Sequence, residues 1–570
     1  MGSSFSSNKA IVHGKRLERS RLLEEASTSG KSSDREKYLQ ATACGIVSRI
    51  ESGEWTATEV LEAYIARAVE AQAATNCLTE IMFKDARVQA KDLDAEFAAT
   101  KKLRGPLHGV PFSVKDFYRV KGYDTTIGFT QWANDPAEEN AALVDHIIAA
   151  GGIPMVKTNV PQTMLSFECN NPLWGRTTNP YNPGYTCGGS SGGEGAILAM
   201  DGSALGIGSD IAGSLRIPTA YCGIYSLMPS FPRVSTFGCR GPDPGFEGLI
   251  AINGPMARSV EDLKLFCRTL FGVPDAISLV PPMPYREPDL PEKLKFGFYT
   301  SDGFFKASPA NKRAILETVA ALRKQGHECI EFEPPNVHEA LVTFVALSSS
   351  DSYRHMLSSL GPDPLDNTLK LVVYGSRVPY PLKALAHFIL SKILDDWRAA
   401  DVIMAAGSKS YSQYSKWIEK RQAYNEMFYM NVWNKYGFDG IIAPVQALPQ
   451  LLEGGATELS PLVMSTVLYN VVQSSAGCIP VTRVDPEKDM LTDEWTKPSP
   501  DKTSILEDQL YRGKKPFYDP VPMKGMPVGI QVVAKKWEEE KVLAMMSVVD
   551  KALGEDRGFG PGACRPPEKV

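Results

Sequence analysis

The sequence predicts an α/β protein, a single large α/β/α layered domain in which helices flank a central twisted mixed sheet. Segments with the spacing of strands alternate with amphipathic helical segments along the 570 residues. No linker rich in Pro, Gly and Ser separates two periodic halves, and no internal repeat occurs. We therefore expect one domain over residues 34–570. The polar residues 1–33, rich in Ser, Lys and Arg, are expected to be a disordered N-terminal segment.

The first predicted helix begins at a capping box, Thr56-Ala-Thr-Glu59, which satisfies the first free N–H groups of the helix. Its apolar stripe consists of Val60, Leu61, Tyr64, Ile65, Ala68 and Val69. A second helix runs through Ile148 and is closed by Gly151. The expected strands are residues 108–115, 153–156, 296–299, 330–332, 441–445 and 528–533. The expected long connections are the Pro-rich residues 280–291 and the polar residues 485–520.

The composition indicates a soluble enzyme. The net charge is −5, and no basic stripe marks a nucleic-acid surface. The ten cysteines are scattered singly without a C-x-x-C pair, which predicts reduced thiols in a cytoplasmic protein. No H-E-x-x-H motif supplies metal ligands, so we expect neither a metal nor another cofactor. We find no signal peptide and no apolar run of about 18 residues, so we expect no membrane-spanning helix.

Two loops rich in glycine and serine, residues 187–195 and 209–218, carry the strongest chemical signal. Glycine costs backbone entropy and buries little surface, so its repetition indicates N–H groups that approach a ligand closely. A Walker phosphate loop would need Lys and then Ser or Thr after Gly193, but Glu194 follows and would repel phosphate. The dinucleotide fingerprint would need a glycine at Ile211. The two loops therefore favour acyl transfer over nucleotide binding.

An α/β-hydrolase with an elbow serine is an alternative, because residues 188–192 match G-x-S-x-G. An elbow follows a buried strand directly, whereas residues 179–186 contain two prolines and a glycine. This context favours a loop before the serines. The elbow mechanism also needs a histidine base, and sequence order leaves four candidates open. They are His327, His338, His355 and His387.

A lysine base fits the pattern better than a histidine does. The apolar segment from His108 to Asp116 is expected to form a strand that ends at Lys115. A lysine amine acts as a general base only when its neutral form is populated, and burial achieves this by desolvation. Serine–lysine catalysis is a known variant of the catalytic triad. A solvated surface charge is the alternative for Lys115.

Together these motifs resemble those of the amidase signature family, closest to its fatty acid amide hydrolase and fungal acetamidase-like branch. The family's G-G-S-S-G-G block matches residues 188–193. Its D-x-G-G-S-x-R-x-P block matches residues 210–218 with one change, Ala212 for glycine. The strand-end lysine matches Lys115, and the spacings are 190 − 115 = 75 and 214 − 190 = 24 residues. Residues 160–175 indicate the branch. Further family-like segments are residues 440–444, 470–480 and 525–531.

The resemblance implies that residues 34–570 form a catalytic domain with a Ser-Ser-Lys triad that acts through an acyl-enzyme. Ser214 would be the nucleophile, Ser190 the bridging serine on a cis peptide bond, and Lys115 the terminal base. The implied oxyanion hole consists of the backbone N–H groups of Ile211, Ala212, Gly213 and Ser214. The Ala212 methyl group would make a positive φ less comfortable there. The supporting residues, which ordinary loop capping explains equally well, are Ser191, Asp210 and Arg216.

The resemblance also implies a small-molecule amide as substrate, cleaved to an acid and an amine or ammonia. An apolar acyl or aryl group is expected, because four apolar residues flank the implied acyl channel; core packing is the alternative for each of them. They are Met164, Leu165, Phe167 and Trp174. Esters and carbamates stay open as substrates. So does another class of function, an amide-binding or amidotransferase-subunit protein of the same fold without independent hydrolysis.

Residues 379–394 are expected to form an amphipathic helix. Its apolar residues are Leu382, Leu385, Phe388, Ile389 and Ile393. Packing against the core is favoured; the alternative is a membrane-facing cap like that of fatty acid amide hydrolases, with peripheral membrane contact. Residues 1–6 match an N-myristoylation pattern at Gly2, although such short matches also arise by accident. A homodimer is compatible with the sequence as well.

Overall fold

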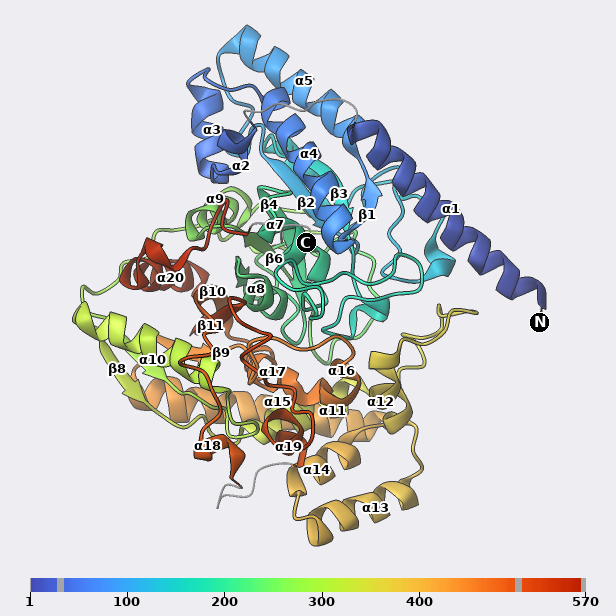
Figure 1. Ribbon diagram of the computed structural model, residues 1–570, viewed down its shortest axis with the longest axis vertical. Helices are drawn as coiled ribbons and strands as arrows, with labels where there is room; N and C mark the ends of the chain where they lie inside the picture. Colours follow the sequence, from blue (N-terminus) through green and yellow to red (C-terminus); the bar gives the residue numbers. More distant parts are fainter. Residues whose placement is uncertain (1, 28–34, 498–504, 565–570) are drawn as a thin grey trace.

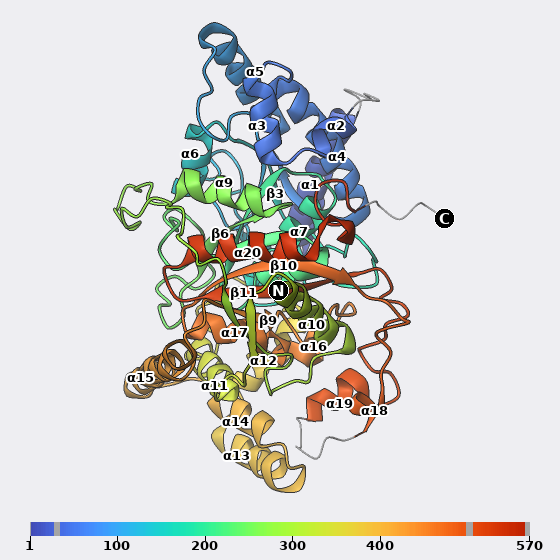
Figure 2. The same ribbon diagram turned by 90° about the vertical axis from the view of Figure 1, so that its left-hand side faces the viewer.

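The computed structural model describes residues 2–27, 35–497 and 505–564. Within them one sheet of eleven strands crosses the molecule, flanked by helices (Figures 1 and 2). The strands are β1 (Leu78–Ile81), β2 (Pro111–Lys115), β3 (Ile153–Thr158), β4 (Leu205–Asp210), β5 (Tyr225–Met228), β6 (Ile252–Ala257), β7 (Lys295–Phe298), β8 (Glu328–Glu331), β9 (Gly440–Pro444), β10 (Ser475–Arg483) and β11 (Pro527–Ala534). Their order across the sheet is β1-β3-β2-β4-β6-β5-β10-β11-β9-β7-β8.

Helices precede, connect and follow the strands along the chain. They are α1 (Gly2–Ser27), α2 (Glu36–Leu39), α3 (Ala43–Glu51), α4 (Ala57–Thr75), α5 (Phe83–Thr100), α6 (Ala142–Ala149), α7 (Gly192–Ala199), α8 (Arg216–Cys222), α9 (Val260–Leu270), α10 (Pro309–Lys324), α11 (Val337–Ser348), α12 (Asn367–Ser376), α13 (Tyr380–Phe388), α14 (Trp397–Ala405), α15 (Tyr411–Phe428), α16 (Ala456–Leu459), α17 (Met464–Val471), α18 (Asp493–Thr496), α19 (Ile505–Tyr511) and α20 (Glu539–Leu553). The short 3-10 or π turns are η1 (Thr130–Trp132), η2 (Gln162–Met164), η3 (Ile389–Ile393), η4 (Tyr429–Asn434), η5 (Ser460–Val463) and η6 (Glu555–Arg557).

The sheet is mixed, as the sequence predicts. Strand β2 lies between β3 and β4 and is parallel to both, whereas β4 and β6 are antiparallel. Strand β10 pairs with β5 on one side and β11 on the other, so strands from both ends of the chain share one sheet. Because the carboxyl ends of parallel strands meet at one edge, the ends of β2 and β4 bring Lys115 close to Ser209 and Asp210.

The first two predicted helices are present. The capping box at the start of α4 forms in both directions, because the Thr56 side chain accepts from the Glu59 N–H and the Glu59 carboxylate accepts from the Thr56 N–H. The second predicted helix is α6, and the chain turns after it at Gly151, whose φ is +91°. A local sequence pattern therefore sets these helix ends.

Five strands lie outside the segments expected as strands: β1, β4, β5, β6 and β10. Glycine weakens the strand signal in two of them, since β4 contains Gly206 and β10 contains Gly477. Each glycine admits a side chain from a covering helix. A Cβ on Gly206 would lie 2.0 Å from Glu194 Oε2, and one on Gly477 would lie 2.0 Å from Met546 Sδ. Close helix packing therefore outweighs strand propensity at these positions.

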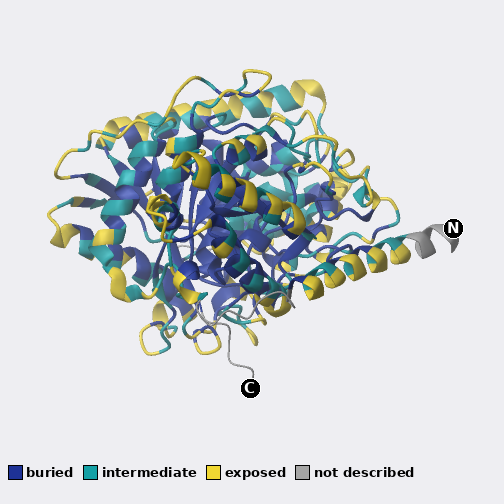
Figure 3. Cartoon of the chain, turned by 90° about the horizontal axis from the view of Figure 1, so that it is seen from above, coloured by how far each residue is buried: buried dark blue, intermediate teal, exposed yellow. Residues whose placement is uncertain are grey.

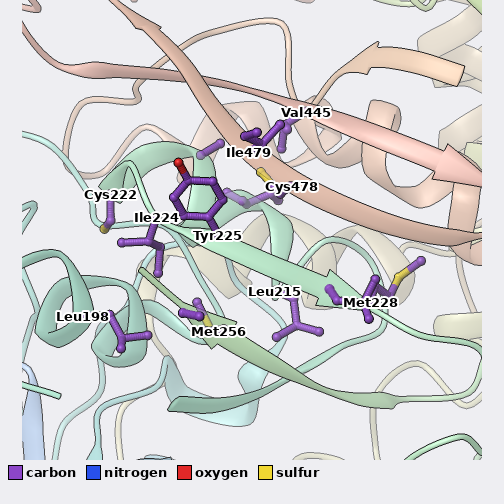
Figure 4. Close-up of a cluster of buried hydrophobic side chains, with 14 of the residues drawn as sticks. Leu198, Leu215, Cys222, Ile224, Tyr225, Met228, Met256, Val445, Cys478 and Ile479 are labelled. Carbon is purple, nitrogen blue, oxygen red and sulfur yellow. The ribbon is translucent and has the colours of Figure 1, made fainter. Parts of the chain in front are cut away.

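The buried core of the protein lies along the strands of the sheet (Figure 3). Figure 3 shows buried residues along the strands and exposed residues on the outer helices and loops. Figure 4 shows one part of this core, where Leu198 of α7, Tyr225 of β5, Met256 of β6 and Ile479 of β10 gather beside Leu215. Leu215 directly follows Ser214 in the chain and is fully buried, so the core anchors the loop that carries Ser214.

The expectation of a disordered segment over residues 1–33 is wrong for residues 2–27, which form α1; residues 28–33 lie outside the described part. Lys15 Nζ lies 2.7 Å from the Glu80 carboxylate and 3.0 Å from that of Asp124. Arg16 donates to the Leu173 carbonyl at 2.7 Å. The basic side chains that suggested solvation therefore hold the helix against the domain through acceptors that only the tertiary fold provides.

Two other expected segments differ from the structure. Residues 485–520 were expected to be a long connection, but they contain the short helices α18 and α19 on either side of residues 498–504, which lie outside the described part. Residues 379–394 form α13 and η3, and their apolar side chains do not pack into the core. Their exposed fractions are 57% for Leu382, 55% for Leu385, 56% for Phe388 and 66% for Ile393. In Figures 1 and 2, α13 and α14 project from one end of the molecule. In the described residues no helix combines the length and apolarity that crossing a bilayer requires.

Candidate active site

Lys115 is the last residue of β2, every residue of which is buried. Its Nζ lies 2.7 Å from Ser190 Oγ, 3.0 Å from Ser191 Oγ and 2.9 Å from Ser209 Oγ. The side chain is completely buried. Lys115 and Ser190 therefore meet as the sequence predicts, and Ser209 joins them as a residue that sequence reasoning missed although it opens the second glycine-rich loop.

The environment of Lys115 favours its neutral amine. Three hydroxyl neighbours suit either protonation state, because each hydroxyl both donates and accepts a hydrogen bond. Burial therefore decides, and no carboxylate among the described residues lies within ion-pair distance of this amine. Desolvation lowers the pKa of Lys115 to about 7, against the more distant charges of Asp210 and Glu194. A proton acceptor is thus available near neutral pH.

Ser190 lies in a loop, and its peptide bond with Gly189 is cis, as the resemblance implies. The close approach of the two glycine-rich loops requires Gly188, because a Cβ there would lie 2.7 Å from Pro218 Cα and its φ is +82°. No strand leads into Ser190: β3 ends at Thr158 and α7 begins at Gly192. The strand-to-helix turn of an elbow serine is therefore absent at this position in the described chain, as the prolines indicated.

The four histidines that an elbow mechanism needed have other partners. His338 and His387 contact Asp401, His355 contacts Asp243, and His327 Nδ1 accepts from the Leu294 N–H. In the described residues none of them hydrogen-bonds to the serines of the two loops. The titratable side chain that contacts Ser190 is therefore a lysine and not a histidine.

Ser214 lies in the loop between β4 and α8, and it is 9% exposed because it faces a cavity. The Ser191 N–H donates to the Ser214 carbonyl at 3.2 Å, so the two serine loops contact each other through their backbones. The hydrogen bonds of the described residues do not include one between the Ser190 and Ser214 hydroxyls. The structure therefore shows the contact between Lys115 and Ser190, and a relay through Ser190 to Ser214 stays a prediction.

The predicted oxyanion donors differ from one another. The N–H groups of Ile211, Ala212 and Ser214 have no hydrogen-bond partner in the described residues, and all three residues line the cavity. The Gly213 N–H, in contrast, donates to Asp210 Oδ1 at 2.7 Å. Gly213 therefore differs from the other three: its N–H fixes the turn of the loop, and its φ is positive, +124°. Ala212 does not have a positive φ, so its methyl group causes no backbone strain.

Asp210 and Arg216 form a buried pair behind this loop, with Arg216 Nη2 3.1 Å from Asp210 Oδ1. Although burial opposes it, the Arg216 guanidinium and further donors lower the pKa of Asp210. Arg216 also donates to Asn470 Oδ1 at 2.6 Å and to Gln531 Oε1 at 3.0 Å. Asp210 and Arg216 therefore position the loop, and sequence reasoning missed the partners Asn470 and Gln531 because they lie more than 250 residues away.

Glu194, which the sequence used only to exclude phosphate, is a buried carboxyl next to the site. Its Oε1 accepts from Thr158 at 2.7 Å and its Oε2 from Ser113 at 2.5 Å, which ties α7 to β3 and β2. Desolvation raises the pKa of Glu194 to about 7, against those two hydrogen bonds and the charge of Lys115. Glu194 thus links α7 to β2 and β3. Its carboxyl changes charge at about the same pH as the Lys115 amine.

A cavity of about 500 Å³ opens beside Ser214. Met164, Leu165 and Phe167 line it, as the sequence predicts, but Trp174 does not. Trp174 is 2% exposed, its Nε1 donates to Thr126 at 3.2 Å, and Lys15 and Arg19 of α1 lie over its ring. Trp174 therefore lies outside this cavity, because α1 covers its ring. Apolar wall residues that sequence reasoning missed include Phe304, Leu341, Phe344, Val345, Val372 and Val402.

Comparisons with known proteins agree with this geometry. The family model described as Amidase matches residues 59–543. The chain is 34% identical to fatty acid amide hydrolase 1 of Caenorhabditis elegans over 511 residues, which cover 88% of this chain and 86% of that protein. It is 32% identical to an acetamidase of Emericella nidulans over 538 residues, 91% of this chain and 90% of that protein. A solved fatty acid amide hydrolase structure matches with a TM-score of 0.81 and 28% identity, over 92% of this chain and 87% of that one. The chain therefore belongs to the amidase signature family of enzymes.

Proposed function

We propose that this amidase cleaves the C–N bond of carboxylic amides through an acyl-enzyme at Ser214, with Lys115 and Ser190 as the proton relay. The 2.7 Å contact between the buried Lys115 amine and Ser190 Oγ carries the proposal, because it provides a proton acceptor that is not histidine. Family membership supports the same reaction class.

The reaction balances in two halves. The lone pair of Lys115 Nζ accepts the proton of Ser190, Ser190 Oγ accepts the proton of Ser214, and Ser214 Oγ forms a bond to the amide carbonyl carbon. The relay then runs backwards, so the leaving nitrogen receives the proton as the C–N bond breaks. Water adds to the acyl-enzyme by the same relay, releases the acid and restores the Ser214 hydroxyl.

The N–H groups of Ile211, Ala212 and Ser214 are the donors proposed for the tetrahedral oxyanion. Each lacks another partner in the described residues, so none must give up a hydrogen bond when the negative charge forms. Loss of one such donor costs about 3–4 kcal/mol of transition-state stabilisation in other enzymes. The preformed loop thus supplies much of the catalytic effect without reorganisation.

The substrate arm in the cavity is proposed to be apolar, either an acyl chain or an aryl group. The walls are mainly aliphatic and aromatic, and the volume of about 500 Å³ lies within the usual range of small-molecule sites. Relatives named as hydrolases of fatty acid amides and as acetamidases show that both long and short acyl groups occur in this family. Esters and carbamates would pass through the same tetrahedral chemistry and stay open.

A serine-directed fluorophosphonate probe with peptide mapping tests the proposed roles. We expect labelling at Ser214, its abolition in Ser214→Ala, and much slower labelling in Lys115→Ala. Release of free amine from a simple amide by the isolated chain is the matching activity assay. Labelling at Ser190 or Ser191 that does not need Lys115 would contradict the relay. Absence of both labelling and amine release would favour the amide-binding or amidotransferase-subunit alternative.

A peripheral membrane contact through α13 and η3 is a second proposal, which one observation favours. Leu382, Leu385 and Phe388 are more than half exposed, while Ala386 and Leu390 of the same segment line the cavity. An apolar amide could therefore pass from a bilayer to the cavity along one helix. All ten cysteines are free thiols, which supports a cytoplasmic location. The homodimer stays a prediction.

Flotation with phosphatidylcholine vesicles tests the membrane contact. We expect the wild-type chain to float with the vesicles. The double variant that combines Leu385→Glu and Phe388→Glu should remain in the dense fraction. Leu316→Glu is the matched control, because Leu316 is 44% exposed on α10, outside this segment. Equal flotation of all three proteins, or of none, would contradict the contact.

A further inference from the structure

Lys383 on α13 is a charged side chain in the wall of the apolar cavity. It is 6% exposed, whereas its apolar neighbours Leu382 and Leu385 face solvent. The cavity also includes Ser214, which belongs to the loop after β4. In Figure 1, β4 lies in the interior of the molecule and α13 lies at one end. A substrate arm that reaches from Ser214 toward α13 therefore meets an amine.

The hydrogen bonds of Lys383 leave one donor unused in the described residues. Its Nζ donates to the Ser376 carbonyl at 3.3 Å and to the Ala406 carbonyl, at the C-terminal ends of α12 and α14. An ammonium group has three N–H donors. Gly407 admits the amine to this position, because a Cβ there would lie 2.7 Å from Nζ. One N–H of Lys383 is thus available to an acceptor in the cavity.

The charge around Lys383 is not neutralised in the described structure. Lys409 lies close by, with its Nζ 2.7 Å from the carbonyls of Ala405 and Gly407, and neither lysine forms an ion pair among the described residues. Each helix C-terminus contributes roughly half a negative charge, so the ends of α12 and α14 offset about one of the two positive charges. Burial lowers the pKa of Lys383, and burial with the charge of Lys383 lowers that of Lys409 to about 8.

Three carboxylates on the neighbouring helices α14 and α16 have other partners or face solvent. Asp401 of α14 contacts His338 and His387, and Asp396 caps the first turn of the same helix through the Ala399 N–H. Glu458 lines the cavity from α16, yet it is exposed to solvent. A local excess of about one positive charge thus remains at the α13 side of the cavity, and a bound anion would relieve it.

We propose that Lys383 binds a carboxylate at the end of the substrate's apolar arm, so that the favoured substrates are amides whose apolar arm carries a terminal carboxylate. The inference rests on the proposed hydrolase function and names its substrate class. The carboxylate would accept the third N–H of Lys383 and partly neutralise the two lysines. Either side of the amide can carry such an arm: the acyl part in half-amides of dicarboxylic acids, or the amine part in N-acyl ω-amino acids.

A matched series of amides tests the proposal with the full-length protein. Anilides of one chain length that end in methyl, hydroxyl or carboxylate are compared by kcat/KM at pH 7, together with N-acyl ω-amino acids of the same length. Two kinds of substrate end in a carboxylate: the anilides with that terminal group and the N-acyl ω-amino acids. We expect at least one of them to have a kcat/KM at least about tenfold higher than the methyl-ended amide of the same length, because a charge-assisted hydrogen bond provides an effect of that size. The hydroxyl-ended chain separates charge from polarity and should gain much less.

Lys383→Met is compared with Lys392→Met, an exposed lysine of η3 outside the cavity wall. The ratio between carboxylate-ended and methyl-ended substrates should fall to about one in Lys383→Met and stay at the wild-type value in Lys392→Met. If Lys383→Met does not fold, the wild-type series decides alone. No carboxylate preference in the wild type, or a preference that survives Lys383→Met, overturns the proposal. Failure to hydrolyse every amide would instead overturn the hydrolase function itself.

Discussion

Lys115 shows how one residue acquires its chemistry from its neighbours. The amine is buried at the end of β2 and touches three hydroxyls at 2.7–3.0 Å, but no carboxylate approaches it closely in the described residues. Water that would stabilise the charged form is excluded, and hydroxyls replace it only in part. A residue type that is usually a surface cation thus becomes a base near neutral pH.

This environment predicts the pH dependence of hydrolysis. Because desolvation lowers the pKa of Lys115 to about 7, the base is lost by protonation below that pH and present above it. We expect kcat/KM to rise with pH through about 7 and then level off. Burial also raises the pKa of Glu194 to about 7, so two variants are needed to assign the rise. Glu194→Gln should keep it and Lys115→Ala should lose it; the opposite result would assign the rise to Glu194.

Gly213 predicts a second residue-scale outcome. Its φ is +124°, and a Cβ there would lie 2.4 Å from Thr466 Oγ1, so Gly213→Ala should distort the loop that carries Ser214. We expect kcat/KM to fall by at least about 100-fold, the size of one lost oxyanion donor. Gly241→Ala is the control, because a Cβ there would meet nothing within 4 Å. Equal kcat/KM values for the two variants would show that the loop tolerates the methyl group.

The sequence predicted the residues that a compact motif contains and missed those that only the fold brings near. Lys115 and Ser190 were predictable, because a strand-end lysine and a glycine-rich block recur together in the family. The use of the Gly213 N–H was not predictable, because a hydrogen bond to Asp210 depends on how the loop turns. Trp174 was mistaken for a cavity residue because an apolar stretch does not reveal which helix covers it.

At the scale of elements, α1 is the clearest case of tertiary contacts outweighing composition. Its basic residues resemble a solvated tail in the sequence, yet Lys15 lies between the carboxylates of Glu80 and Asp124. Arg19 adds a hydrogen bond to the Leu78 carbonyl of β1 at 2.6 Å. None of these three acceptors is near α1 in the sequence, so a local pattern could not have predicted this helix from its partners. Strands β4 and β10 were missed for a related reason. Their glycines weaken the strand signal because they leave room for side chains of the covering helices α7 and α20.

Lys15 gives a prediction for this element. Lys15→Met leaves Glu80 and Asp124 close together without their shared cation, and we expect the free energy of unfolding to fall by about 3–5 kcal/mol. Burial, opposed by Lys15, already raises the pKa of Glu80 to about 7. Without Lys15, that carboxyl should protonate more readily, so the loss should shrink as the pH falls from 8 to 6. Denaturant unfolding of Lys15→Met and of the control Lys9→Met measures it; an equal loss in both would contradict the pairing.

At the scale of the whole molecule, the site depends on strands from both halves of the sheet. Lys115 and Ser209 come from β2 and β4, while Arg216 is held by Asn470 of α17 and Gln531 of β11. Strand β10 pairs with β5 on one side and with β11 on the other, and so joins these two groups of strands into one sheet. The sequence predicted one domain with one central sheet, but only the strand order shows which side chains meet across it.

Gln531 therefore predicts a long-range effect. Its Oε1 accepts from Arg216, and its Nε2 donates to the carbonyls of Pro444 and Ser465 at 2.9 and 3.0 Å. Gln531→Leu would leave these buried groups unpaired, at about 1–3 kcal/mol each, so we expect the free energy of unfolding to fall by at least about 2 kcal/mol. Because Arg216 then holds Asp210 less firmly, kcat should fall more than KM rises. Denaturant unfolding and steady-state kinetics, with exposed Gln325→Leu as the control, measure both effects. A stable Gln531→Leu with wild-type kcat would show that Asp210 and Arg216 keep their positions without support from the C-terminal strands.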